Sequence, residues 1–483
     1  MARHIEETPY LTFDDVLLKP KHSDFLPEET ELATRFSRNI RLNIPLASAA
    51  MDTVTEHRLA IAMALQGGIG IIHRNLTIEQ QAEEVRKVKR FRGGLIPQPY
   101  TLTPNHTVAN ARRMEQENGM SGILLVEDDK LAGIVTSRDL WFQNDPGKKL
   151  REIMTEKVIT ARPGTTLDEA KEILYKHRIE KLPLVDDFGK VAGLFTIKDV
   201  RRDMTFPRTV TDPEGRLIVG AAVGPSGEML ERAGALVEAG VDVIVLDTAH
   251  GNSQFVIDAL AKLKSAYDVD IVAGNVATAD TARHLIEAGA DGIKVGIGPG
   301  SICTTRVVTG IGVPQISAIM DVTAGIRDVP VIADGGIKYA GDIPKAIAAG
   351  ADCVMIGNLF AGTDESPGET VIINGRSYKE YRGMGSIEAM KKGSKDRYLQ
   401  AGVHDNDLVP EGIEGIVPYK GPLGHYLHQL VGGLQKGMCD SGCRTIEDMK
   451  TRSTLIQISP GSMAESHPHS VTITKESPNY QRQ

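Results

Sequence analysis

One cysteine stands in a segment whose composition favours nucleophilic chemistry, the sequence KVGIGPGSICTTR at residues 294–306. Cys303 is flanked by hydroxyl side chains and lies close to Arg306. A nearby positive charge and backbone dipoles lower the pKa of a thiol, and the thiolate is the nucleophilic form. The alternative is that Cys303 is a small buried hydrophobe, as most lone cysteines are. The preceding glycines allow a tight turn that presents N–H and C=O groups to a ligand or an ion: Gly296, Gly298 and Gly300.

The spacing of buried strands predicts the scaffold that carries this loop. Three phrases each run from a helix end, through a glycine suited to a left-handed cap, into a β-branched strand: EAGVDVIVLD (238–247), EAGADGIKVG (287–296) and AAGADCVMIG (348–357). Five further strand candidates bring the number to eight: 45–51, 68–73, 217–223, 270–276 and 330–336. Eight βα units predict an α/β fold of the (β/α)₈ TIM-barrel type, with the cysteine loop after the sixth strand, on the face where barrel enzymes carry their chemistry. A doubly wound sheet is the structural alternative.

A second repeat interrupts this pattern after the second βα unit. The motif of glycine, two apolar residues, threonine, two residues and aspartate occurs as GIVTSRD at 133–139 and as GLFTIKD at 193–199. Each copy ends a block that begins with an apolar helix and a strand. We therefore predict two similar α/β modules inserted at 93–205, between barrel segments at 1–92 and 206–483. The glycine-rich and charged stretch after residue 358 is typical of lids and site loops.

The bulk composition excludes several classes of protein. A chain of 483 residues exceeds one compact domain, and its formal charge of −8 argues against a nucleic-acid partner. No apolar run approaches the roughly 20 residues that span a bilayer, and the first residues lack the pattern of a signal peptide. Four cysteines, including Cys439 and Cys443 without a second pair, favour neither a disulfide framework nor a zinc site. We expect a reduced, cytoplasmic protein with no membrane partner.

The loop GPGSICTTR resembles the catalytic loop of the inosine monophosphate dehydrogenases, and the paired modules resemble the tandem CBS domains of that family. The resemblance extends over essentially the whole chain, beginning with YLTFDDVLL at 10–18. It implies a barrel with an inserted CBS pair and the NAD-dependent oxidation of inosine 5′-monophosphate (IMP) to xanthosine 5′-monophosphate (XMP), the committed step of guanine nucleotide synthesis. In such an enzyme Cys303 attacks carbon 2 of the hypoxanthine ring, hydride passes to NAD, and water hydrolyses the resulting thioimidate.

The resemblance also implies a mobile flap that helps to activate this water. The sequence KDRYLQ places Arg397 and Tyr398 at the family's Arg-Tyr pair, and Thr305 and Glu411 occupy its nearby proton-handling positions. A charged flap suits a segment that must exchange places with departing NADH. An arginine that acts as a general base requires a site that strongly disfavours its cation. The alternative is that Arg397 is a solvated surface charge.

Substrate contacts are expected on the loops after the later strands. By resemblance, Asp334 binds the ribose hydroxyls, and Gly335 and Gly336 adjoin it. Barrels commonly bind phosphate at the ends of the seventh and eighth strands. The other expected substrate contacts are Ser301, Gly357, Asn358, Tyr381, Arg382, Gly383, Met384, Gly385 and Glu411. Asn275 and Met51 are expected as pocket walls, although core packing accounts equally well for Met51.

The dinucleotide must bind without a Rossmann fingerprint, because GGIGIIH at 67–73 lacks the third glycine and its acidic partner. The resemblance assigns NAD to two segments of the chain. The expected contacts are Asp247, Thr248, Asn252, Gly296, Ile297 and Gly298. A helix-capping role is the alternative for Asp247, and His250 is expected to be structural.

The family also uses a monovalent cation, usually potassium. Carbonyl ligands suit such a weakly held ion. By resemblance the ligands are the carbonyls of Gly298, Gly300 and Cys303, joined by Glu465, Ser466 and His467 from a neighbouring subunit. A site shared in this way predicts a homotetramer, which could pair into an octamer.

The inserted modules carry no nucleophile or acid/base constellation. By resemblance to CBS domains, Asp139 and Asp199 would meet a ribose, and Arg138 and Arg201 would meet the phosphates of ATP or GTP. The alternative is a pair of modules that only mediates assembly. Two rival functions stay open: a guanosine monophosphate (GMP) reductase, which usually lacks both the modules and the Arg-Tyr flap, and a catalytically silent nucleotide sensor.

Overall fold

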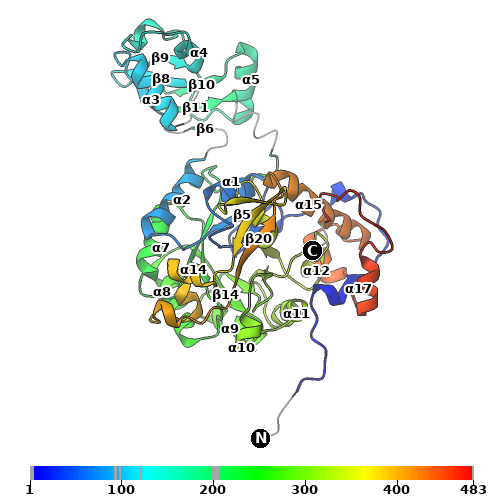
Figure 1. The fold of residues 1–483 in the computed structure, drawn as a ribbon. Coiled ribbons are helices and arrows are strands. Elements are labelled where there is room, and N and C mark those ends of the chain that lie inside the picture. The colour runs from blue at the N-terminus through cyan, green and yellow to red at the C-terminus, as the bar shows by residue number, and fades with distance from the viewer. Residues whose placement is uncertain (1–4, 92–94, 97–98, 119–121, 198–205, 481–483) are drawn as a thin grey trace. The chain divides into compact units, whose positions relative to one another are not determined.

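The computed structural model describes residues 5–480, apart from 92–94, 97–98, 119–121 and 198–205. The chain divides into two compact units (Figure 1). The barrel unit consists of Met1–Phe91 and Arg208–Gln483, and the inserted unit consists of Arg92–Pro207. No helix among the described residues is long and apolar enough to cross a membrane.

Eight parallel strands close into a barrel in the first unit, which confirms the predicted (β/α)₈ fold. Their side chains are almost all buried, as expected for parallel strands that are covered on both faces. All eight predicted strands are present, and in chain order they are β4 (Leu46–Ser48), β5 (Ile69–Ile72), β12 (Gly220–Val223), β13 (Val243–Asp247), β14 (Asp270–Val276), β15 (Gly292–Val295), β16 (Val331–Asp334) and β17 (Cys353–Ile356). The cysteine loop therefore follows the sixth strand, β15.

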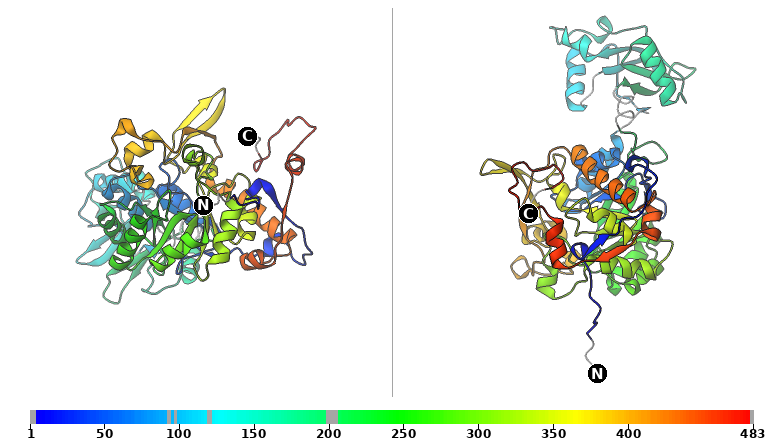
Figure 2. Two further views of the ribbon diagram at one scale, coloured as in Figure 1. Left: turned by 90° about the horizontal axis from the view of Figure 1, so that it is seen from below. Right: turned by 90° about the vertical axis from the view of Figure 1, so that its right-hand side faces the viewer.

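Helices alternate with these strands and pack around the outside of the barrel (Figure 2). They are α1 (His57–Leu65), α2 (Ile78–Arg90), α7 (Met229–Glu238), α8 (Gln254–Ala266), α9 (Ala279–Glu287), α10 (Thr305–Thr309), α11 (Gln315–Gly325), α12 (Asp342–Ala348) and α13 (Asn358–Ala361). The predicted capping glycines are confirmed, since Gly240, Gly289 and Gly350 have φ of +88°, +105° and +117°. Each ends a helix in the left-handed conformation and turns the chain into the next strand.

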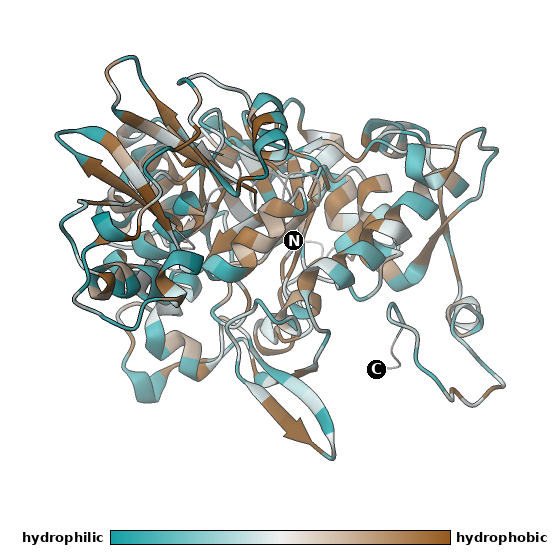
Figure 3. Ribbon diagram, turned by 90° about the horizontal axis from the view of Figure 1, so that it is seen from above, coloured by the Kyte–Doolittle hydropathy of each residue, from teal (hydrophilic) through white to brown (hydrophobic). Residues whose placement is uncertain are grey.

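The segments before and after the barrel strands form smaller elements. A two-stranded sheet joins β1 (Val16–Leu18) to β21 (Leu455–Gln457), and another joins β2 (Thr34–Arg35) to β3 (Arg41–Leu42). Beyond the barrel, β18 (Thr370–Ile373), β19 (Arg376–Arg382) and β20 (Glu414–Pro418) form an antiparallel sheet, followed by α15 (Leu423–Asp440), α16 (Ile446–Arg452) and α17 (Pro460–Ser466). Figure 3 shows β18 as the hydrophobic strand of a projecting hairpin, in which Ile372 is 75% exposed.

A run of short helical turns lies between β19 and β20, where the sequence predicts a lid. It contains α14 (Ile387–Ala389), a π-helical turn (Met390–Ser394) and 3₁₀ turns at Lys395–Tyr398 and Asp405–Asp407. We call residues 386–410 the flap. Its polar sequence packs against the barrel through only a few buried side chains, among them Met390, Ser394 and Asp396.

The inserted unit contains the same order of elements twice. The first copy runs through α3 (Val108–Asn118), β8 (Gly122–Glu127) and β9 (Lys130–Thr136), and the second through α5 (Leu167–His177), β10 (Lys181–Val185) and β11 (Val191–Thr196). Two short strands, β6 (Leu95–Ile96) and β7 (Thr101–Leu102), complete a three-stranded sheet in each copy, and α4 (Ser137–Trp141) follows β9. Separate apolar clusters stabilise the copies, and Leu124, Ile134 and Leu194 form a third cluster between them.

The first repeated motif has a clear local role. The Asp139 carboxylate accepts hydrogen bonds from the backbone N–H and the hydroxyl of Thr136, at 2.8 and 2.7 Å, and so caps the start of α4. Arg138 is 77% exposed and pairs loosely with Glu180, at 3.8 Å. Their proposed contacts with a nucleotide stay a prediction. Asp199 and Arg201 lie outside the described residues.

Lys89 fixes the point at which the chain leaves the barrel and returns to it. It lies in the last turn of α2, with its Nζ 3.0 Å from Asp212 Oδ2 and 2.6 Å from Asp242 Oδ2, and its side chain is 5% exposed. Asp212 belongs to the segment that returns from the inserted unit. The buried ammonium group of Lys89 thus links the segment that precedes the insertion to the segment that follows it, and both to Asp242 of the barrel.

We predict that Lys89→Ala lowers the free energy of unfolding of the barrel unit by about 3–5 kcal/mol, because it removes the ion-pair partner of the buried Asp242 carboxylate, while Asp212 keeps its ion pair with Arg216. Chemical denaturation monitored by circular dichroism measures the change. Arg86→Ala on the same helix is the control, since Arg86 pairs with Glu79 and Glu83 near solvent and should cost under about 1 kcal/mol. Equal small losses for both variants would contradict the assigned role of Lys89.

Candidate active site

The candidate site lies at the carboxyl ends of the barrel strands, where the loop after β15 carries Cys303. Gly296 and Gly298 turn this loop with φ of +148° and +74°. A side chain at Gly296 would collide with the carbonyl oxygen of Asp334, so glycine is required for the close approach of the two loops. The guanidinium of Arg306 stabilises the loop, since its Nε donates to the carbonyl of Ile297 at 3.0 Å.

Cys303 begins a chain of hydrogen bonds that ends on a carboxylate. Its Sγ lies 3.1 Å from Thr305 Oγ1, and this hydroxyl donates to Glu411 Oε2 at 2.8 Å. The backbone fixes this arrangement, because the N–H of Thr304 donates to the carbonyl of Glu411 at 2.9 Å. A proton at the thiol or at a neighbouring water therefore has a connected path to Glu411.

Glycines allow three backbone segments to pack directly beside Cys303. The N–H of Gly383 donates to the carbonyl of Ile413 at 2.9 Å, and that of Glu411 donates to the carbonyl of Gly385 at 3.0 Å. A Cβ at Gly385 would lie 2.8 Å from the ring of Tyr398 and 2.9 Å from the backbone of Glu411. The absence of a side chain here lets the flap tyrosine and the proton path lie side by side.

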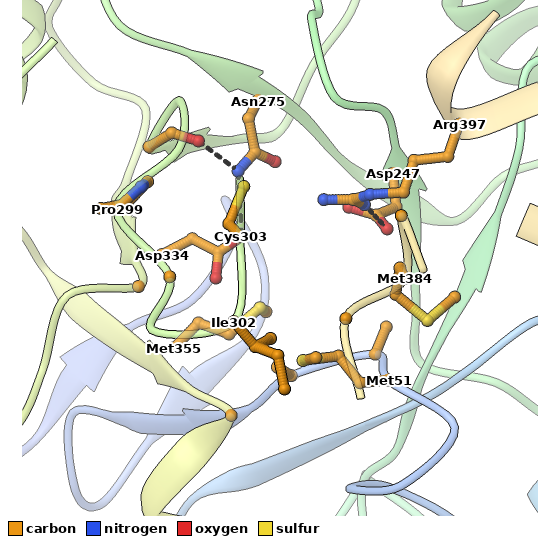
Figure 4. Close-up of a pocket in the computed structure, with 18 of the residues that line it drawn as sticks. Met51, Asp247, Asn275, Pro299, Ile302, Cys303, Asp334, Met355, Met384 and Arg397 are labelled. Carbon is orange, nitrogen blue, oxygen red and sulfur yellow. Dashed lines mark hydrogen bonds and ion pairs between the residues drawn. The ribbon is translucent and has the colours of Figure 1, made fainter. Parts of the chain in front are cut away.

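Arg397 and Tyr398 of the flap reach the same pocket. The Arg397 guanidinium forms an ion pair with Asp247 at the end of β13, and its carbonyl accepts a hydrogen bond from the N–H of Ala249 at 3.0 Å. Burial raises the pKa of Tyr398, which keeps its phenol neutral and able to donate at neutral pH. Figure 4 shows Arg397 directed at Asp247.

Lys294 connects the two carboxylates of the site, and the sequence analysis did not single it out. Its Nζ lies 2.8 Å from Asp247 Oδ1 and 2.7 Å from Asp334 Oδ2, and it also contacts Asn275. The side chain is 2% exposed. A lysine within the buried strand GIKV is the sequence signal that could have revealed it, because lysine is almost never buried without a partner.

The pocket combines an apolar wall with a polar one. Figure 4 shows Met51, Ile302, Met355 and Met384 gathered below, with Asn275, Asp247 and Arg397 above. The predicted site residues that line this pocket are Asp247, Gly296, Gly298, Gly300, Cys303, Asp334, Gly335, Gly357, Tyr381, Gly383, Met384, Gly385, Arg397, Tyr398 and Glu411. Asn275 and Met51 line it too, as the sequence analysis expected.

A second pocket shares several walls with the first, among them Gly300, Gly335 and Gly357. It adds Ser301, Gly336 and Asn358, whose Nδ2 donates to Ser301 Oγ at 2.8 Å. Together the two pockets provide an elongated site, with Cys303 in one part and backbone N–H groups, hydroxyls and an amide in the other. Hydroxyls and backbone N–H groups of this kind are suited to bind an anion.

Several predicted residues lie outside the lining of these pockets. Thr248 donates to the carbonyl of Gly274 at 2.7 Å, and Asn252 pairs with His284 at 3.2 Å. Arg382 forms a bidentate ion pair with Asp52, and Thr305 lies behind Cys303. In this chain the ring of His467 contacts Tyr339 and Tyr480, next to Glu465 and Ser466 at the end of α17.

The other three cysteines are poor candidates for a nucleophile. Cys353, Cys439 and Cys443 are buried, whereas Cys303 is partly accessible. Burial raises the pKa values of Cys353 and Cys443. Within the described residues, no group of three or more His, Cys, Asp or Glu side chains could hold a metal ion.

Comparison with known proteins places this site in a family. Residues 10–469 match the family described as the IMP dehydrogenase / GMP reductase domain. The chain belongs to this family. The inosine-5′-monophosphate dehydrogenase of Bacillus subtilis is 56% identical over 477 residues, and that of Aquifex aeolicus is 55% identical over 478 residues. Each alignment covers 97% of both chains.

Among solved structures, GMP reductase from Trypanosoma brucei in complex with guanosine 5′-monophosphate is similar, with a TM-score of 0.89 and 42% identity. The alignment covers 96% of this chain and 98% of that one. Coverage this high includes most of the inserted unit. The inserted modules alone therefore do not separate the two activities within the family, although the sequence analysis expected that reductases usually lack them.

We predict that Gly385→Ala lowers the free energy of unfolding of the barrel unit by about 1–3 kcal/mol, because the added methyl group must displace Tyr398 or the backbone of Glu411. Gly415→Ala is the matched control, since nothing lies within 4 Å of its added Cβ, and a change within about 0.5 kcal/mol is expected. Denaturant unfolding compares the two, and indistinguishable midpoints would argue against tight packing at Gly385.

Proposed function

We propose that this protein oxidises IMP to XMP with NAD, through a covalent intermediate on Cys303. The observation that carries the proposal is the connected set of Cys303, Thr305 and Glu411 in a pocket that the flap closes with Arg397. Identities of 55–56% with the two named IMP dehydrogenases, over nearly the whole chain, support the same conclusion.

In the first half-reaction the thiolate of Cys303 attacks carbon 2 of the hypoxanthine ring. Carbon 2 then loses hydride to NAD, the oxidant that the protein must bind, and the thioimidate remains on the sulfur. Asp334 would hold the ribose hydroxyls, since its carboxylate lies at the pocket wall and is fixed by Lys294 and Asn275. Ser301, Gly357 and Asn358 would hold the phosphate in the adjoining pocket.

In the second half-reaction water adds to the thioimidate carbon, and the carbon–sulfur bond breaks to release XMP. The water oxygen becomes the carbonyl at carbon 2 and so loses both protons: one ends on ring nitrogen 3, and the other goes to the departing sulfur or, where the sulfur leaves as thiolate, to a base. The chain from Thr305 to Glu411 can accept a proton of the water. The guanidinium of Arg397 is engaged in an ion pair with Asp247, so in this arrangement Arg397 suits the orientation of water and the stabilisation of negative charge better than general base catalysis.

The Asp247 carboxylate is the expected partner of both the flap and the dinucleotide. The resemblance assigns this carboxylate to the nicotinamide ribose, and in the structure the guanidinium of Arg397 engages it. A ribose hydroxyl bound to Asp247 would compete with the Arg397 side chain for the space beside this carboxylate. We therefore propose that the flap closes after NADH departs, which separates hydride transfer from hydrolysis in time. Gly296, Gly298 and Ile297 would complete the dinucleotide contacts.

A potassium ion would be held by the carbonyls of Gly298, Gly300 and Cys303. These oxygens lie on one tight turn, and the carbonyl of Gly300 already accepts the N–H of Cys303 at 3.1 Å, which leaves it one lone pair. Glu465, Ser466 and His467 would reach the ion only from a neighbouring subunit. The exposed Ile372 of β18 and Val307 of α10, 75% and 89% exposed, are consistent with surfaces that a homotetramer covers.

The inserted unit is proposed to be a CBS pair that binds ATP or GTP. Its two similar copies of helix and strands support this assignment, while Asp139 has a competing role as a helix cap. A cytoplasmic location and an octameric assembly stay predictions from the sequence.

The first test is NADH production by the purified protein with IMP and NAD, with and without potassium. We expect turnover that potassium stimulates and that Cys303→Ala abolishes, because the variant lacks the attacking sulfur. If there is no turnover with IMP but NADPH is consumed with GMP, the protein is a reductase. Inactivity in both assays would favour the nucleotide sensor.

A second test removes residues 93–205 and joins the barrel ends with a short glycine-serine linker. We expect IMP turnover to stay within about twofold of the full chain, because the site residues all belong to the barrel unit. Any response of turnover to ATP or GTP should disappear. Loss of turnover in a deletion variant that keeps the circular dichroism of the barrel would assign the inserted unit a direct role in catalysis.

A further inference from the structure

A second ion pair joins the flap to the barrel, next to the pair formed by Arg397. Arg74, in the loop after β5, contacts Asp396 of the flap, and their side chains are only 6% and 8% exposed. Neither residue lines the pocket that contains Cys303. Because Asp396 immediately precedes Arg397, any restraint on Asp396 also restrains the position of Arg397.

The barrel is shaped to receive this pair. Gly224, at the end of β12, has no side chain, and a Cβ there would collide with both the Asp396 carboxylate and the Arg74 guanidinium. Asn75, the next residue of the same loop, donates from Nδ2 to the carbonyl of Ala389 at 3.2 Å and to Asp52 at 3.0 Å. The loop after β5 therefore contacts the flap at two places, the end of α14 and the 3₁₀ turn at Lys395–Tyr398.

The ion pair between Arg74 and Asp396 is suited to form and break repeatedly. Nε of Arg74 is buried and has no hydrogen-bond partner among the described residues. A buried ion pair that is incompletely satisfied contributes little net stability, since water solvates both charges when they separate. Removal of one partner is different, because the other charge then stays buried without compensation whenever the flap closes.

We propose that Arg74 is a positioning residue that seats the flap through Asp396 and so controls how often Arg397 reaches Asp247. This inference rests on the proposed function, in which the closed flap serves hydrolysis and the open flap admits the dinucleotide. Loss of the pair should favour the open state. Hydride transfer should then continue normally, while hydrolysis of the Cys303 adduct becomes slow.

The experiment compares Arg74→Gln and Asp396→Asn with the wild-type protein in rapid-mixing assays with IMP and NAD. We expect an unchanged burst of NADH, with a steady-state rate that falls at least about 10-fold because closure becomes rare. Inhibition by excess NAD should appear at lower concentration, because NAD competes with the flap for Asp247. Arg74→Lys, which retains the charge, should restore part of the steady-state rate.

Lys395→Gln is the matched control. Lys395 lies on the same flap and pairs with Asp405, another flap residue, so its loss removes an ion pair without affecting the contact with the barrel. Its burst and steady-state rate should match the wild type. The double variant of Arg74 and Asp396 should be no slower than the slower single variant, since both act through one contact.

Limited digestion with trypsin gives a readout independent of activity. The flap contains Lys391, Lys392 and Arg397, so an open flap should be cut faster in Arg74→Gln than in the wild type, with unchanged cleavage elsewhere. The proposal is overturned if burst and steady state fall together, if neither changes, or if flap cleavage is unaltered. A wild-type protein that produces no NADH would instead overturn the proposed function, while the digestion would still report on the ion pair.

Discussion

Asp247 lies between two cations from different parts of the fold, and the arrangement of the site depends on this carboxylate. Lys294 approaches it from a buried strand, and Arg397 approaches it from the flap. A buried carboxylate without a partner is costly, and Lys294 gives Asp247 a partner that does not depend on the flap. If the flap opens as proposed, Asp247 keeps the ion pair with Lys294, which it shares with Asp334, and a neutral ligand can take the place of the guanidinium.

The same lysine connects Asp247, which contacts the flap, to Asp334 on the pocket wall. Through Lys294 the charge of Asp247 is linked to Asp334, the last residue of β16. Cys303 in turn is fixed by backbone packing rather than by charge, since the glycines at 383, 385 and 412 let three segments lie in contact. Rigid placement of the thiol, combined with the proposed movement of Arg397 with the flap, suits a reaction in two stages.

The sequence predicted the scaffold well, because a parallel barrel strand is buried on both faces and appears as a continuous β-branched run between capping glycines. It also predicted the Cys303 loop, since cysteine, glycines and hydroxyls are close in sequence. Glu411 could be assigned only by resemblance, because nothing local indicates that β20 and its preceding loop lie beside Cys303. Lys294 and Arg74 were missed for a related reason: their partners come from distant segments, and a lone basic residue usually lies at the surface.

Three of the four cysteines are buried and the fourth is partly accessible, so a thiol-specific reagent can be used to count the candidate active sites in a sample. A small electrophile that reacts with thiolates meets one accessible sulfur in each chain, at Cys303, while Cys353, Cys439 and Cys443 are shielded. Covalent titration should therefore be stoichiometric with chains. The same selectivity means that an oxidant in the cell would modify Cys303, the proposed nucleophile, before any of the buried thiols, so that the proposed activity would be lost while the fold is still intact.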